Sequence, residues 1–144
     1  METKESFGHL HIYKGYALFK KEEGRIIKSS LRETKGIITT HRGKKFIIIN
    51  GHLGMREQVK TLIHEFLHLS YDPHSRLSFY FYSVNEKEYE ELEDKIEKET
   101  VRIYECQPCL VEHLKELLLE TSYREDYRLE MERIYRKGST LYHG

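Results

Sequence analysis

The segment from residue 55 to residue 70 constrains the fold most, because it contains neither glycine nor proline and its apolar residues recur at helical spacing. Gly54 precedes this segment and Asp72-Pro73 follows it, so we expect a helix that begins near residue 55 and ends near residue 70. The apolar residues of the segment are Val59, Leu62, Ile63, Phe66 and Leu69. This spacing predicts a helix whose apolar back packs on a core.

The same segment carries His64, Glu65 and His68 in the pattern H-E-x-x-H. Side chains four residues apart lie one turn apart on one face of a helix, so the two imidazoles can bind a single metal ion. Glu65 leaves the helix about 100° round from His64. Two nitrogen ligands, an open coordination position for water and a carboxylate to take its proton are what a zinc hydrolase needs. The alternative is a core helix whose polar side chains are merely hydrogen-bonded.

Length and charge limit the other classes of function. A chain of 144 residues suits one compact domain. Its 24 basic and 24 acidic side chains balance, so we expect neither a nucleic-acid partner nor an anionic membrane surface. The sequence has no apolar run of 18 residues and begins without the apolar stretch of a signal peptide, which favours a cytoplasmic protein.

Residues 1–50 are expected to be mainly β-structure and to form a small antiparallel sheet. The alternating and aromatic character of Leu10–Phe19 suggests a strand, with Gly15 as a bulge or bend. Further strands are expected at 36–40 and 45–49, which would form a hairpin, and the segment 25–32 suits either a strand or a short helix. The apolar run from Phe46 to Ile49 should be covered by the helix that follows it.

Residues 55–137 are expected to be mainly helical. The segment 71–85 is aromatic and loop-like, with a short strand at 77–84 as an alternative. A charged helix should run from Asn85 to about Glu105 and end before Pro108. Two further amphipathic stretches span 110–120 and 123–137. The order of these elements predicts a single zincin-like domain over residues 1–144 with an α+β fold.

A catalytic zinc ion needs a third protein ligand, and the sequence offers several. His74 has the metzincin spacing after His68, but Tyr71 stands where that pattern needs a glycine turn. The helix expected over residues 85–105 supplies the alternative, a ligand set of two histidines and one glutamate. Its candidates are Glu90, Glu93 and Glu97. Glu93 and Glu97 lie at the edge of the apolar arc of that helix, whereas Glu90 lies further toward solvent.

The order of strands, H-E-x-x-H helix, aromatic loop and glutamate-bearing helix resembles the ImmA/IrrE-type peptidases and the archaeal minigluzincins. The resemblance covers roughly residues 36–110, and Glu97, Thr100 and Pro108 match the spacing of the first family around its ligand glutamate. It implies a gluzincin in which Glu97 is the third ligand. It also implies that the strand Phe46–Ile49 is an exposed edge that pairs with the substrate backbone. A latent enzyme, with its cleft covered by the segments after Pro108, is a further hypothesis.

The sequence therefore predicts a zinc-dependent metallopeptidase that acts on a peptide or protein. His64, His68 and Glu97 would bind Zn2+, and Glu65 would act as general base. Candidate donors to the oxyanion are Tyr71, His74 and His113.

The alternative is an interaction module without catalytic activity, in which zinc only stabilises the fold. The two cysteines form Cys106-Gln-Pro-Cys109, and a C-x-x-C in a reducing compartment is more often metal-binding or redox-active than a structural disulfide. Together with His64 and His68 they would make a closed site of two cysteines and two histidines.

Overall fold

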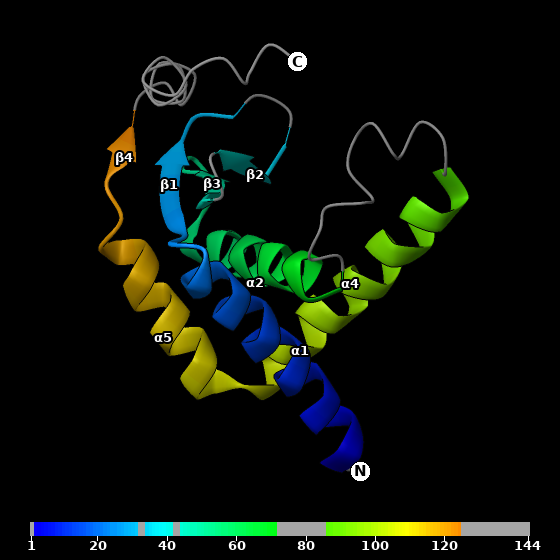
Figure 1. Ribbon diagram of the computed structural model, residues 1–144. Helices are drawn as coiled ribbons and strands as arrows, with labels where there is room; N and C mark the ends of the chain where they lie inside the picture. Colours follow the sequence, from blue (N-terminus) through cyan, green and yellow to red (C-terminus); the bar gives the residue numbers. More distant parts are fainter. Residues whose placement is uncertain (1, 32–33, 42–43, 72–85, 125–144) are drawn as a thin grey trace.

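The computed structural model describes residues 2–31, 34–41, 44–71 and 86–124 (Figure 1). The elements, in chain order, are α1 (Glu2–Lys21), β1 (Arg25–Ser29), β2 (Gly36–His41), β3 (Lys44–Asn50), α2 (Met55–Tyr71), α4 (Glu86–Cys106), α5 (Pro108–Leu119) and β4 (Tyr123–Arg124). The predicted α+β fold is confirmed. The predicted strand at 77–84 lies outside the described residues, as does most of the predicted helix at 123–137.

The sheet is mixed, with the strand order β2-β3-β1-β4. β2 and β3 are antiparallel and form the predicted hairpin, with Ile37 opposite Ile48. β1 is parallel to both β3 and β4, so the expectation of a purely antiparallel sheet is wrong. β1 also settles the ambiguous segment 25–32, since residues 25–29 form a strand. β3 lies inside the sheet, so the expectation that Phe46–Ile49 is an exposed edge is wrong. The edge strand on this side of the sheet is β2.

Residues 2–21 form a helix, so the prediction of a strand over Leu10–Phe19 is wrong. The reason is visible in the buried positions: Ile12 and Phe19 are almost fully buried and lie seven residues apart, which places them on one face of a helix. The partly buried Tyr16 lies between them on the same face, and its ring packs edge-on against Phe66 of α2 at 5.4 Å between centroids. Helical periodicity therefore prevails over the local alternation of apolar and polar residues.

Gly15 is a point of close approach between α1 and α2, and not a bulge or bend in a strand. A Cβ atom at this position would lie 1.9 Å from the carbonyl oxygen of Phe66. Only a residue without a side chain lets the two helix backbones come so close. Since Phe66 lies between Glu65 and His68, this contact supports the back of the H-E-x-x-H turn.

α2 is the central element of the core. β3 is buried on both faces, whereas the sequence predicted only that the run Phe46–Ile49 is covered by the helix that follows it. Ile47 and Ile49 share the core cluster of α2, while Phe46 and Ile48 pack with β1 on the other face. Figure 1 shows the sheet on one side of α2, with α1, α4 and α5 around the rest of that helix. The apolar back of α2 and the predicted cover of β3 by the following helix are thereby confirmed.

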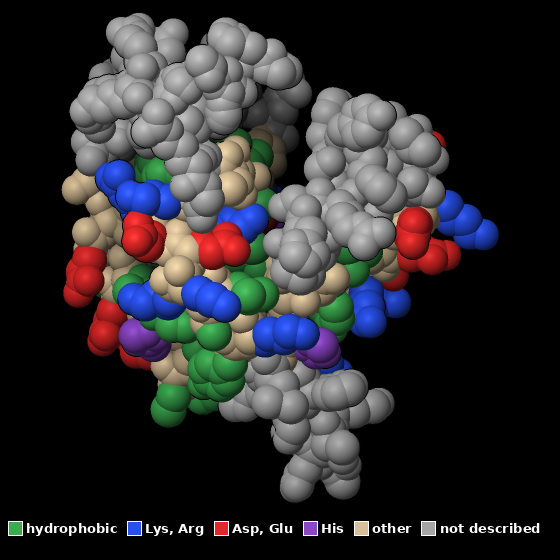
Figure 2. Space-filling model, in the orientation of Figure 1, with side chains coloured by type: hydrophobic (Ala, Val, Ile, Leu, Met, Phe, Trp, Pro, Cys, Tyr) green, Lys and Arg blue, Asp and Glu red, His purple; other side chains and the backbone are tan. Residues whose placement is uncertain are grey.

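The surface matches the balanced composition. On the face seen in Figure 2, Lys and Arg side chains are interspersed with Asp and Glu and do not gather in one patch. Among the described residues, no helix combines the length and the apolar character needed to cross a membrane.

Candidate metal centre

The polar face of α2 brings His64 and His68 to the crossing with α4. Both side chains are about one-fifth exposed, and their ring centroids are 5.0 Å apart. The apolar residues on the back of α2 are buried, so the rotation of the helix is fixed and its two histidines must face outward from the core. The pairing of the two imidazoles expected from the sequence is therefore present.

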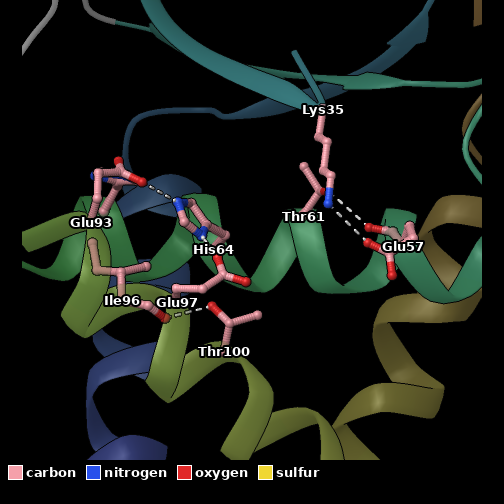
Figure 3. Close-up of polar contacts among 9 residues, drawn as sticks. Lys35, Glu57, Thr61, His64, Glu93, Ile96, Glu97 and Thr100 are labelled. Atoms are coloured by element: carbon pink, nitrogen blue, oxygen red, sulfur yellow. Dashed lines mark hydrogen bonds and ion pairs between the residues drawn. The ribbon is translucent and has the colours of Figure 1, made fainter. Parts of the chain in front are cut away.

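Glu93 of α4 lies across both histidines. Its Oε1 is 3.1 Å from His64 Nε2, and its Oε2 is 2.6 Å from His68 Nε2. One ligand atom from each of these three residues lies within 4.8 Å of the others, and within the described part of the chain this is the one such group that could hold a metal ion. Figure 3 shows Glu93 and His64 pointing toward each other from the two helices.

Glu97, the expected third ligand, occupies a different position. Its Oε1 lies 3.3 Å from His64 Nδ1, the ring nitrogen that faces away from Glu93, and its side chain is 64% exposed (Figure 3). Glu93, and not Glu97, lies against the Nε2 atoms of both imidazoles, because the crossing point of α4 on α2, and not the spacing to Pro108, decides which turn meets them. Glu90 is exposed on α4 and outside this group. His74 lies outside the described residues.

Glu65 leaves α2 on the side of the sheet and is only 7% exposed. The neighbouring strand β2 comes close because its first residue is Gly36. A Cβ atom on Gly36 would lie 2.6 Å from Thr61 Cγ2 and 3.4 Å from Glu65 Oε2. Sequence reasoning did not single out Gly36, although a glycine that opens a strand pattern indicates a close approach of another element.

The surroundings shift the pKa values of Glu93, His64 and Glu65, and not all in the same direction. Burial opposes the charging of Glu93, but hydrogen bonds to the two imidazoles prevail and hold its pKa well below the usual range. Burial also opposes the charging of His64, yet its hydrogen bond with Glu93 and the surrounding carboxylates raise its pKa above 6.5. Burial raises the pKa of Glu65, an effect that the two imidazoles reduce. Glu93 is thus ionised at neutral pH, and Glu65 holds a proton more readily than a surface glutamate.

The cysteines do not join this group. Cys106 is the last residue of α4 and Cys109 lies in the first turn of α5; both are free and exposed. Cys106 follows Glu93 by 13 residues on the same helix, a distance of about 20 Å at 1.5 Å per residue. The structure therefore does not assemble the closed site of two cysteines and two histidines.

Two of the candidates for an oxyanion donor, Tyr71 and His113, lie in the described part of the chain, and both contact other residues. The Tyr71 hydroxyl donates a hydrogen bond to Glu99 Oε1 at 2.5 Å. His113 is exposed on α5, where its ring lies 6.4 Å from that of Tyr16 in α1. The hypothesis that the end of the chain covers the site concerns mainly residues outside the described part.

The site thus consists of two imidazole nitrogens and one carboxylate from two crossing helices, with a second, buried carboxylate beside them. Comparisons with models of protein families, with curated proteins and with solved structures gave no match to this chain. We therefore infer the function from the geometry and chemistry of these residues.

Proposed function

We propose that this chain is a zinc-dependent metallopeptidase in which His64, His68 and Glu93 hold the metal ion and Glu65 is the general base. The observation that carries the proposal is the position of Glu93, whose two oxygens lie against the Nε2 atoms of both histidines. A fold that merely satisfied two core histidines would not need to bring an ionised carboxylate from another helix onto both of them.

The donor set fits zinc. Two imidazoles and one glutamate leave a fourth position open, which is the arrangement of catalytic rather than structural zinc sites. Zinc requires ionised carboxylate and neutral imidazole ligands, and the lowered pKa of Glu93 supplies the first. The other ring nitrogen of His64 has its own partner in Glu97, 3.3 Å away. Such a carboxylate fixes the tautomer and orientation of a ligand imidazole, so we assign Glu97 this supporting role.

Zinc bound at this position would supply a Lewis acid that polarises a carbonyl group and lowers the pKa of a water molecule toward 7. Glu65 is placed beside the ligands, one residue after His64, and burial raises the pKa of its carboxyl group. A base whose pKa is closer to neutrality transfers protons in both directions more effectively. We assign one carboxylate oxygen of Glu65 to accept the proton of the attacking water and to deliver it to the leaving amine.

The substrate is proposed to be an extended peptide that lies along β2. β2 pairs with β3 on one side only, and within the described residues no strand pairs with its other side. Free backbone groups on a sheet edge bind an extended chain by adding it as a further strand. Gly36 brings this edge close to Glu65, so we propose that β2, and not the strand Phe46–Ile49 implied by the resemblance, pairs with the substrate backbone.

The substitution Glu65→Gln tests the proposal, because the amide keeps the size of the side chain but cannot accept the proton. We expect the variant to retain zinc and to lose peptide hydrolysis by a factor of roughly 10²–10⁴, measured on a pool of fluorogenic peptides. Glu57→Gln is the matched control, since Glu57 lies on the same helix but forms an exposed ion pair with Lys35 (Figure 3). Full activity in Glu65→Gln would remove Glu65 as the base. A zinc-loaded parent that cleaves no peptide in the pool would contradict the peptidase assignment.

A further inference from the structure

We call His64, His68 and Glu93 the metal group. A second contact joins α2 to α4 one turn beyond it. His64, His68 and Tyr71 follow one another at spacings of four and three residues, so they lie on one face of α2. All three meet acidic side chains of α4, and the third does so through the hydrogen bond from the Tyr71 hydroxyl to Glu99 Oε1 at 2.5 Å. Glu99 is a buried carboxylate, with a side chain that is 8% exposed.

The surroundings of this contact hold both partners in place. The Tyr71 ring lies between the ring of His11 in α1, 4.5 Å away between centroids, and the Nζ atom of Lys95 in α4, 4.7 Å from its centroid. The second carboxylate oxygen of Glu99, Oε2, lies 3.7 Å from Arg102 Nη2. Elements α1, α2 and α4 therefore meet around one phenol.

The hydrogen bond has a fixed direction. Burial and the neighbouring Glu99 carboxylate raise the pKa of Tyr71, so the phenol remains protonated and acts as donor at neutral pH. A bond from a hydroxyl to a carboxylate is stronger than one between neutral groups. The proposed mechanism uses neither Tyr71 nor Glu99, and their close, partly buried pairing is consistent with a structural role at this crossing.

We propose that Tyr71 and Glu99 are positioning residues that fix α4 on α2 so that Glu93 stays against both histidines; this inference rests on the proposed function. The reason is geometric. Glu99 follows Glu93 by six residues, about 9 Å along the helix. Ile96 and Ile103 of α4 already pack in the core with α2, and the Tyr71–Glu99 hydrogen bond adds a directional polar contact beside the histidines. Polar contacts at two points, Glu93 and Glu99, then fix the orientation of α4 next to the two imidazoles. Glu93 itself is 31% exposed, so the turn that carries it is not enclosed by the core.

The test is Tyr71→Phe, which removes the hydroxyl and keeps the ring between its neighbours. We expect zinc affinity, measured by competition with a chelator, to fall by about 10–100-fold, the effect typical of groups that support a metal ligand. With Co2+ in place of zinc, the visible absorption spectrum of Tyr71→Phe should shift toward that of Glu93→Ala, because Glu93 is displaced. Glu99→Gln, which keeps an acceptor for the phenol, should lose less affinity than Glu99→Ala.

Tyr104→Phe is the matched control. Tyr104 also lies on α4 near α2, but its contacts with Arg56 and Lys60 of α2 run through its ring, each 5.5 Å from the centroid. This variant should bind zinc and Co2+ as the parent does. If the parent binds zinc and Tyr71→Phe matches it in affinity and in Co2+ spectrum, the positioning role is overturned while the metal site stands. A parent that binds neither ion overturns the proposed site, and this inference with it.

Discussion

Replacing Gly15 by alanine tests the contact between α1 and α2 that supports the back of the proposed metal site. The new Cβ atom would lie 1.9 Å from the carbonyl oxygen of Phe66, whereas approaches under 3.0 Å are essentially never seen. α1 must therefore retreat from α2 by about 1.1 Å, the difference between these two distances. Because the clash is with backbone, rotation of a side chain cannot relieve it.

The expected cost follows from two opposing effects. Overpacking of a core costs about 1–3 kcal/mol, and a clash with backbone belongs at the upper end of that range. Alanine in place of glycine inside a helix returns about 1 kcal/mol. The net loss of unfolding free energy is then about 2 kcal/mol, which corresponds to a fall in Tm of about 4–8 °C for a chain of this size.

Thermal unfolding followed by circular dichroism, with a chelator present, measures this change without a contribution from metal binding. Lys14→Ala is the control, because Lys14 is the exposed neighbour on the same helix and its loss should change stability by less than about 0.5 kcal/mol. A Gly15→Ala variant as stable as the parent, or more stable, would refute the close helix contact. That outcome is what the strand reading of residues 10–19 would favour.

Two further predictions concern the metal group. His64 has a raised pKa in the folded, metal-free protein, so its contribution to stability is full below pH 6.5 and is lost as pH rises through the folded-state value. Since zinc must displace that proton, the rise in Tm caused by zinc should be larger at about pH 8 than at about pH 6; a larger rise at the lower pH would contradict the assigned ligands. The double variant Cys106→Ser, Cys109→Ser should bind zinc as tightly as the parent in a chelator competition, because both thiols are exposed and outside the metal group. A large loss of affinity in this variant would restore the closed site.

Local sequence signals are sufficient to predict the helices whose faces differ clearly in polarity. α2 was predicted within a residue of its ends, since its apolar back and its breakers at Gly54 and Asp72-Pro73 are all local signals. α4 was predicted equally closely from its acidic first turn and from Pro108. The hairpin of β2 and β3 followed from two apolar runs around a short polar turn.

The N-terminal helix was missed because two periodicities compete in Leu10–Phe19. Aromatic and apolar residues at nearly alternate positions mimic a strand, while Ile12, Tyr16 and Phe19 also fit one face of a helix. Packing on Phe66 decides between them, and nothing within the segment reveals that contact. The expectation of a bulge or bend at Gly15 is wrong for the same reason, since its need for space comes from Phe66, which is more than fifty residues away in the sequence.

The third member of the metal group depends on a crossing between helices that are distant in sequence. Glu93 and Glu97 lie one turn apart on the same face of α4, so helical geometry leaves both in reach of α2. Where α4 crosses α2 decides which of them meets both Nε2 atoms. The interior position of β3 has a similar origin, because its parallel pairing with β1 is not encoded in either strand alone.

The most direct test of the account is the zinc content and zinc affinity of three proteins: the parent, Glu93→Gln and Glu97→Gln. We expect about one zinc ion per chain in the parent. Glu97→Gln should lose about 10–100-fold in affinity, as expected for a group that orients a ligand, and Glu93→Gln should lose more. A parent without zinc affinity would contradict the metal centre itself. A greater loss in Glu97→Gln than in Glu93→Gln would contradict the assignment of Glu93 as the third ligand.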